Sequence, residues 1–210
     1  MRSADIATVI RVVLVVAAAY LILYHLNGYI LILLLALIFY LDNLDGYLAI
    51  RELDGSITPY KYYIKALNDK ELKNKIYKIK EKVAERYKYG GRIDIAGDRF
   101  VEYTLFILFT YLHILPLFVF LIVILRNSFT DALLASKGTS SKMKTKIAKI
   151  LFKSNLSRLL SGLLKFILFA YLILVYEYNY NIIVGYVLVA AFLIFFLIRG
   201  LAEIIEALKQ

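Results

Sequence analysis

The apolar residues of this chain gather in long blocks and are not spread evenly along it. A helix needs about 20 mostly apolar residues to span a bilayer. Six blocks approach that length: residues 6–24, 29–48, 93–113, 115–125, 159–176 and 182–204. The fourth is short by itself and is expected to borrow residues on both sides. The pattern predicts an all-α polytopic membrane protein with six transmembrane helices, forming a single domain over residues 1–210.

Composition supports a membrane location. Hydrophobic residues make up 61% of the chain and the mean hydropathy is +0.71, whereas soluble domains contain about 45–50% apolar residues. The first block lacks a small-residue cleavage site and runs almost directly into the second. It is therefore expected to be a span and not a cleavable signal peptide.

The placement of basic residues predicts the orientation. The net charge is +10, and 12 of the 26 Lys and Arg residues lie in 51–92, with a further 8 in 126–158. The three short turns around Asn27, Ile114 and Asn179 contain none. The positive-inside rule places both basic segments and both termini in the cytoplasm of a multi-pass cell-membrane protein. Loops facing an anionic leaflet account for the basic charge, so no nucleic-acid partner is expected.

The first basic segment contains an amphipathic pattern within residues 68–89. Apolar residues recur every three or four positions with Lys between them, after a predicted cap at Asn68 or Asp69; they are Leu72, Ile76, Ile79, Val83 and Tyr87. Such a basic helix either lies on an anionic membrane surface or packs against the cytoplasmic face of the protein. The sequence leaves both possibilities open.

Cysteine is absent and Gln occurs only at position 210, while Lys is abundant. The absence of Cys excludes disulfides and Cys-based metal sites. Scarce Cys and Gln with abundant Lys is typical of heat-adapted proteins. In a thermophilic archaeon, the lipids of the host membrane would be ether-linked.

Acidic residues lie near the ends of two predicted spans, where charge is costly and suggests function. Asp42 and Asp45 are three residues apart, and Asp94 and Asp98 four apart, so each pair shares one face of its helix. Gly46 leaves open space beside Asp45 for a ligand. We expect the four carboxylates to converge with no basic group between them and to bind Mg²⁺, Mn²⁺ or Ca²⁺, which prefer oxygen ligands. Alternatively, they are solvated helix ends.

Together these residues resemble the motif of the CDP-alcohol phosphotransferases, D-x-x-D-G-x-x-A-R followed by G-x-x-x-D-x-x-x-D. The matching positions are Asp42, Asp45, Gly46, Ala49, Gly90, Asp94 and Asp98. The resemblance implies a six-helix homodimer whose polar cavity opens to the cytoplasm. It also implies two divalent ions, Mg²⁺ or Mn²⁺, on Asp42, Asp45 and Asp94. Asp98 would be the catalytic base and a further metal ligand, and Gly46, Ala49 and Gly90 would lie at the nucleotide.

The implied reaction transfers a phosphatidyl-type group, or its archaeal ether counterpart, from a CDP-linked lipid to a small polar alcohol and releases CMP. Two metals can bridge a diphosphate and orient an in-line displacement, and a carboxylate can take the hydroxyl proton. Glycerol phosphate, inositol phosphate and serine all remain open as acceptors.

The chain departs from the family pattern in two places. Ile50 follows Ala49 where the family has Arg, so that Arg51 lies about 100° further round the helix. Arg51 remains a candidate for diphosphate binding. In addition, 38 residues separate Arg51 from Gly90, a much longer spacer than is usual in the family.

Four further residues are candidates for binding substrate. Thr8 and Arg11 resemble part of the family's N-x-x-T-x-x-R segment, with Asp5 in place of Asn. We expect them to contact the nucleotide or the acidic cluster; alternatively, Arg11 snorkels to lipid phosphates. Arg126 and Arg158 could hold an acceptor phosphate or simply follow the positive-inside rule.

Local likenesses around the second basic segment conflict. Residues 140–145 resemble the G-K-x-K-T stretch of glycerophosphate-using members, and Ser157-Arg158 resembles the E-R pair of inositol-phosphate-using members. Neither decides the acceptor. His25 and His113 lie at the turns opposite the aspartates and are expected at the lipid interface, without a metal.

Two other functions fit parts of the pattern. A UbiA-type prenyltransferase also binds a diphosphate through Asp and Mg²⁺, but needs Asn/Asp-x-x-x-Asp motifs and more spans. A non-enzymatic cation-handling protein would carry acids deeper in several spans.

Overall fold

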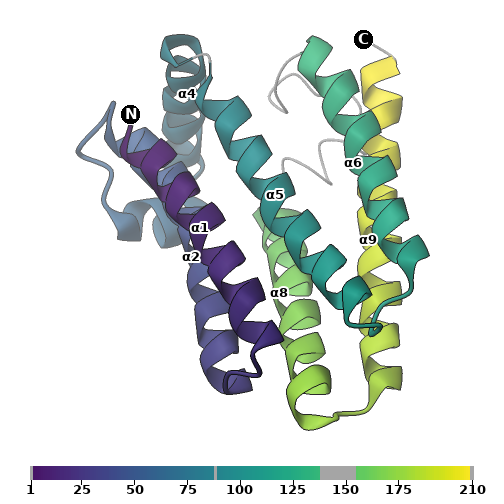
Figure 1. Cartoon of the computed structure of the whole chain (residues 1–210). Coiled ribbons are helices and arrows are strands. Elements are labelled where there is room, and N and C mark those ends of the chain that lie inside the picture. The colour runs from purple at the N-terminus through teal and green to yellow at the C-terminus, as the bar shows by residue number, and fades with distance from the viewer. Residues whose placement is uncertain (1, 88, 138–154, 209–210) are drawn as a thin grey trace. The chain divides into compact units, whose positions relative to one another are not determined.

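The computed structural model describes residues 2–87, 89–137 and 155–208, and all regular structure within them is helical. The prediction of an all-α protein is confirmed for this part of the chain. The long helices are α1 Ser3–Leu23, α2 Gly28–Arg51, α4 Lys70–Arg86, α5 Gly90–Tyr111, α6 Leu117–Lys137, α8 Asn155–Tyr178 and α9 Ile182–Leu208 (Figure 1).

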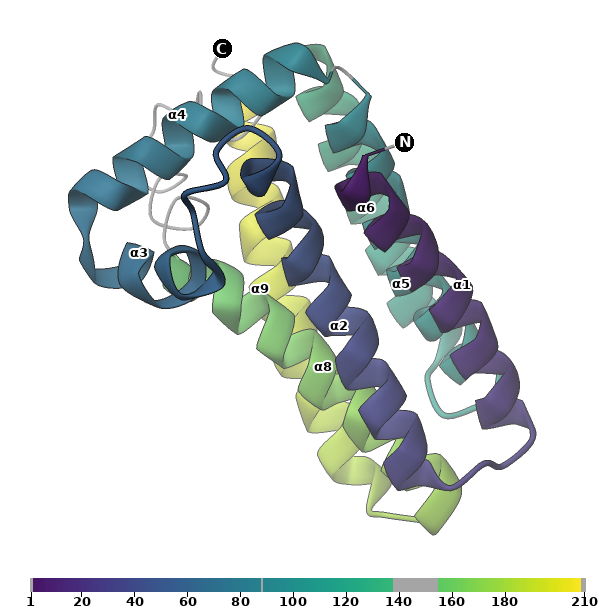
Figure 2. The same cartoon turned by 90° about the vertical axis from the view of Figure 1, so that its left-hand side faces the viewer.

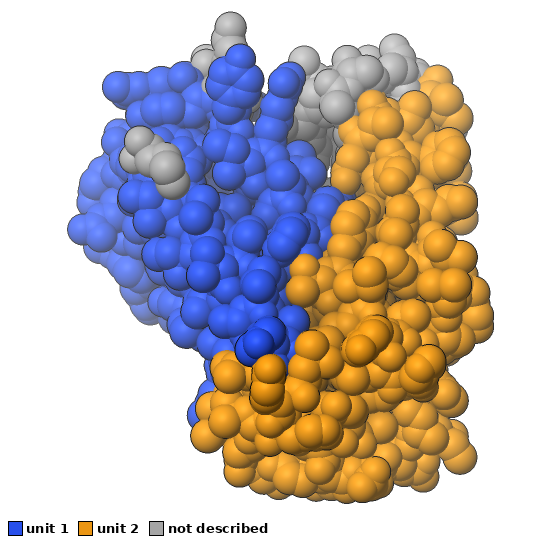
Figure 3. Space-filling model, viewed as in Figure 1, with its two compact units in different colours: residues 1–20, 33–102 blue, residues 21–32, 103–210 orange. Residues whose placement is uncertain are grey.

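The chain divides into two compact units (Figure 3). The first contains residues 1–20 and 33–102, and the second contains residues 21–32 and 103–210. The helices α1, α2 and α5 each contribute residues to both units.

Four helical segments among the described residues are long and apolar enough to cross a membrane: Ser3–Leu23, Gly28–Arg51, Leu159–Tyr178 and Ile182–Ile205. The chain therefore has the character of a membrane protein. α5 has 22 residues, but Arg92, Asp94, Asp98, Arg99 and Glu102 lie in its first 13 positions. α6 has 21 residues. These two helices remain predicted spans.

The short turns predicted near Asn27, Ile114 and Asn179 are present. Each contains a non-glycine residue with positive φ, at His25 (53°), His113 (57°) and Asn179 (55°). A left-handed residue after a helix lets the next amides bond to its last free carbonyls. At the end of α1, the amides of His25 and Leu26 donate to the carbonyls of Ile22 and Leu21. Asn and His tolerate this conformation better than most residues, which explains their presence at these turns.

The fourth apolar block behaves differently from the expectation. α6 begins at Leu117, directly after Pro116, whose carbonyl accepts from the Val119 amide. Proline has no amide hydrogen to donate and is tolerated at a helix start. The helix is therefore extended only at its C-terminal side, to Lys137, and not on both sides.

The described residues between α2 and α5, 52–87 and 89, belong to the first unit and are here called the insertion (Figure 2). It contains a π-helical turn, η1 Lys61–Lys65, then α3 Ala66–Asn68 and α4. The Asp69 side chain accepts a hydrogen bond from the Leu72 amide at 3.0 Å and caps α4, as the sequence predicts.

The apolar face of α4 is buried inside the first unit. Ile76 and Ile79 pack into one cluster with Ile50 of α2, and the remaining members of that cluster are Ile57, Ala66, Leu53, Tyr62, Leu72 and Val83. This decides between the two alternatives for the basic helix: its apolar stripe covers protein and is not available to a membrane surface.

An exposed ion pair ties α4 to the loop after α2. Lys75 Nζ lies 2.8 Å from Asp54 Oδ2. The hydrogen bond from Lys75, with those from Ser56, lowers the pKa of Asp54 to about 2. Asp54 is therefore charged at neutral pH and holds the start of the insertion against α4.

In the second unit, α9 packs against both α6 and α8, and the C-terminal half of α5 belongs to the same unit. Its core is aromatic: the Phe106 ring lies 5.0 Å from Phe169 and 5.5 Å from Phe192, measured between centroids.

Candidate functional site

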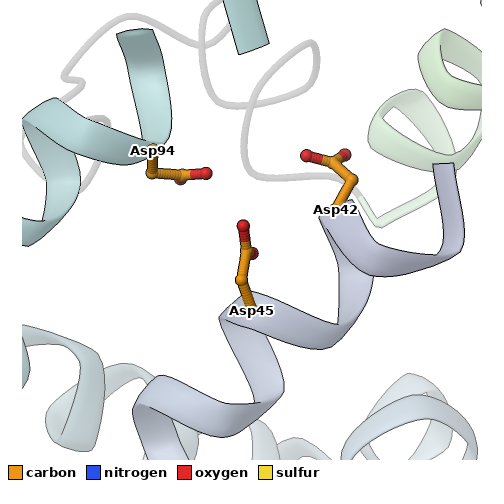
Figure 4. A group of neighbouring side chains, drawn as sticks. All are labelled: Asp42, Asp45 and Asp94. Carbon is orange, nitrogen blue, oxygen red and sulfur yellow. The ribbon is translucent and has the colours of Figure 1, made fainter. Parts of the chain in front are cut away.

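Three aspartates of the first unit converge (Figure 4). Asp42 and Asp45 lie near the C-terminal end of α2, and Asp94 lies in the first turns of α5. One carboxylate oxygen from each lies within 4.8 Å of the other two. The predicted convergence of these carboxylates is thus present in the structure.

The donor set fits a hard divalent cation. All three ligands are carboxylate oxygens, which Mg²⁺, Mn²⁺ and Ca²⁺ prefer. The three oxygens lie within 4.8 Å of one another, so side-chain rotations would be needed for the three aspartates to share one ion.

Arg11 of α1 is a basic group in the middle of the carboxylates, contrary to the expectation that none would be present. Its guanidinium pairs with Asp42, lies 2.8 Å from Asp98 Oδ1 and 3.7 Å from Asp94 Oδ1. The side chain is only 2% exposed. Of the alternatives, contact with the acidic cluster is observed and snorkelling to lipid is excluded by this burial. Its Nε is buried without a hydrogen-bond partner.

Thr8 lies one turn before Arg11 and on the same side of α1. Its hydroxyl donates to Asp45 Oδ2 at 3.2 Å and shares its hydrogen with the Ala4 carbonyl. Both Thr8 and Asp45 are buried. Because the hydrogen bond fixes the Asp45 carboxylate, Thr8 positions a candidate metal ligand.

Asp98 stands apart from the other three aspartates. It lies one turn after Asp94 on α5, its carboxylate contacts the Arg11 guanidinium, and its side chain is 42% exposed. It does not belong to the group whose oxygens lie within 4.8 Å of one another. A carboxylate beside these candidate ligands, and partly exposed, can receive a proton.

Gly97 determines how closely α1 and α5 approach each other, a role that the sequence pattern did not reveal. A Cβ atom on Gly97 would overlap Thr8 Cγ2 and would lie 3.1 Å from Arg11 Nη2. α1 and α5 can approach this closely because the residue has no side chain. The available signal was a pair of small residues, Ala96-Gly97, between two aspartates on a predicted span.

The candidate nucleotide residues occupy different environments. Gly46 follows the candidate ligand Asp45 in the chain and faces the hydroxyl of Tyr62. Ala49 is half-buried, and Arg51 in the last turn of α2 is exposed. Gly90 is buried at the start of α5 beneath the guanidinium of Arg2.

Arg126 belongs to the second unit and is buried there. Its Nη2 lies 2.6 Å from Glu203 Oε2, its Nη1 donates to Asn127 Oδ1 at 3.0 Å, and its guanidinium lies over the Phe196 ring. The side chain of Arg158 and residues 140–145 lie outside the part that the structure describes.

His25 lies in the second unit, where its Nδ1 is 3.4 Å from Glu177 Oε2 and its ring stacks on Tyr176. The grouped metal-type ligands found in the described residues are the three aspartates alone, without histidine.

Comparison of the chain with protein-family models, with curated proteins and with solved structures finds no match.

The close approach at Gly97 yields a prediction. Gly97→Ala should lower the thermal unfolding temperature of the purified protein, because the added methyl group overlaps Thr8 and overpacking typically costs about 1–3 kcal/mol. Gly91→Ala, in the same helix, meets no atom within 4 Å and should leave that temperature unchanged or raise it slightly. Equal unfolding temperatures for the two variants would show that α1 and α5 are not in close contact at Gly97.

Proposed function

We propose that this protein is a membrane enzyme of the CDP-alcohol phosphotransferase type. The observation that carries the proposal is the convergence of Asp42, Asp45 and Asp94 from two helices, at the positions of the family's motif. A CDP-linked lipid would be the donor, and a small polar alcohol the acceptor.

The residues have distinct parts in this reaction. Asp42, Asp45 and Asp94 would hold two divalent ions, Mg²⁺ or Mn²⁺, which neutralise the diphosphate and stabilise the leaving CMP. Asp98 accepts the proton of the acceptor hydroxyl. The hydroxyl oxygen then forms a bond to the lipid-linked phosphorus while the bond from that phosphorus to CMP breaks.

The charge at the site supports a requirement for cations. Fully ionised, the four carboxylates would carry four negative charges, of which the guanidinium of Arg11 offsets one. Anions this close repel one another strongly unless cations lie between them. Divalent ions would supply the missing positive charge, and they would also bind the diphosphate.

The proposal includes a six-span topology with both termini and the aspartates at the cytoplasmic side. It is supported by the 20 basic residues in 51–92 and 126–158, and by the absence of Lys and Arg from the opposite turns. The lipid tails of the donor then stay in the bilayer while its nucleotide stays in water. By resemblance to the family, the protein would act as a homodimer.

CMP release tests the proposed reaction. Purified protein with a CDP-linked lipid and a panel of glycerol phosphate, inositol phosphate and serine should release CMP with one acceptor. Release should stop in excess EDTA and return with Mg²⁺ or Mn²⁺, because the carboxylates need cations to bind a diphosphate. Full turnover in EDTA would exclude a metal-dependent mechanism. A prenyltransferase or a cation-handling protein would release no CMP.

A pair of variants separates the base from the metal ligands. Asp98→Asn should keep metal-dependent binding of CDP and lose turnover by roughly 10²–10⁴-fold, as is typical when one base is removed. Asp45→Asn removes a buried ligand held by Thr8 and should weaken CDP binding itself. Calorimetry measures the binding and CMP release measures the rate. Equal loss of binding in both variants would make Asp98 a metal ligand instead.

The topology can be tested by labelling, because the chain contains no native cysteine. Single cysteines at Tyr24 and Tyr180, which are 68% and 46% exposed beside two of the short turns, should react with an impermeant thiol reagent added outside cells. A cysteine at Lys78, exposed on α4, should react only after the membrane is opened. The reverse pattern would place the aspartates outside.

A further inference from the structure

The insertion brings a group of tyrosines to the part of α2 that carries the aspartates. Tyr62 and Tyr63 belong to η1, and their rings lie 4.8 Å apart between centroids. Tyr47 of α2 is buried beside them, with its ring centroid 5.7 Å from that of Tyr62. The Tyr63 hydroxyl donates to the carbonyl of Asn43 at 2.9 Å. η1 is therefore attached to α2 between the two metal-binding aspartates.

Tyr62 approaches the one position in this stretch that lacks a side chain. Its hydroxyl oxygen lies 3.2 Å from the place that a Cβ atom on Gly46 would occupy. Gly46 comes four residues after Asp42, so both lie on one face of α2, about 6 Å apart along the helix. The Tyr62 hydroxyl is thus about one helical turn from a candidate metal ligand.

The surroundings of Tyr62 fix its ring and favour a negatively charged ligand. The ring is held by Tyr47 and Tyr63, and Lys80 Nζ lies 5.6 Å from its centroid. A ring already held in place loses little conformational entropy when its hydroxyl binds a ligand. π-helical turns such as η1 are rare in proteins and are frequent at functional sites.

The position one helical turn after Gly46 carries an apolar side chain. Ile50 is buried in the core of the insertion, and Arg51 is exposed in the last turn of α2. No cation therefore stands at position 50, one turn after Gly46. The same insertion that buries Ile50 brings the Tyr62 hydroxyl to Gly46.

We propose that Tyr62 binds the diphosphate of the donor, its hydroxyl donating a hydrogen bond to a phosphate oxygen over Gly46. This inference rests on the proposed function, because it requires a diphosphate at the aspartates. It assigns the insertion a direct part in substrate binding.

The test compares the affinity of the full-length protein for CDP in the presence of Mn²⁺. Tyr62→Phe keeps the ring and removes the hydroxyl, and should weaken CDP binding about 10- to 100-fold, the usual range for one hydrogen bond to a charged group. Tyr60→Phe, two residues earlier with a side chain 63% exposed, is the matched control and should bind CDP as the wild type does. Calorimetry gives the affinities.

Binding of Mn²⁺ alone, followed by electron paramagnetic resonance, separates the possible outcomes. Tyr62→Phe should bind Mn²⁺ as the wild type does, since Tyr62 is not one of the three candidate ligands. Equal CDP affinity in wild type and Tyr62→Phe would overturn the role of Tyr62 and leave the proposed function intact. Parallel loss of Mn²⁺ and CDP binding would also overturn it, by making Tyr62 a support of the metal site. A wild type that binds neither Mn²⁺ nor CDP would refute the proposed function itself.

Discussion

The first unit depends on one buried guanidinium. Arg11 is 2% exposed, and a buried charge is tolerated only when opposite charges are close to it. Its partners come from two other helices, Asp42 from α2 and Asp98 from α5. The three helices must therefore meet at Arg11 for the unit to pack. Two further residues lie where these helices meet. Thr8 donates a hydrogen bond to Asp45, and Gly97 leaves room for α1. Packing and candidate chemistry thus use the same residues, so a substitution here changes both.

The two departures from the family motif have a common physical explanation. An arginine at position 50 would place a charge in the apolar core formed by Ile57, Ile76 and Ile79. Burying an unpaired charge is far more costly than burying an isoleucine. Because residues 57–79 pack on this side of α2, position 50 is apolar, and the adjacent basic residue is at the exposed position 51. The apolar position 50 and the long segment before Gly90 therefore belong to one packed substructure.

Periodicity and length predicted the helices well, because each apolar block had turn residues at its ends. The limits of prediction are physical. The stripe of Ile76 and Ile79 shows that one face of α4 is buried, but it cannot show whether lipid or protein covers it. The four aspartates could be paired along each helix from their spacing, whereas the position of Arg11 among them depends on how α1 packs. Gly97 was missed because the only trace of a close helix contact in a sequence is a small residue, and small residues occur for many other reasons. α6 ended later than its apolar block because polar residues can continue a helix beyond the hydrophobic part.

The exposure of the charged groups argues for a binding site over a purely structural ion-pair cluster. Arg11, Thr8 and Asp45 are buried. The side chains of Asp42, Asp94 and Asp98, which lie around the Arg11 guanidinium, are 42–49% exposed. A cluster that only held helices together would gain most from closing over its charges, since solvent weakens exposed ion pairs. Here these three carboxylates stay partly exposed, and the one guanidinium that the described residues place among them carries a single positive charge. Exposed acids next to buried, fixed partners are suited to receive cations and the anionic group that those cations carry.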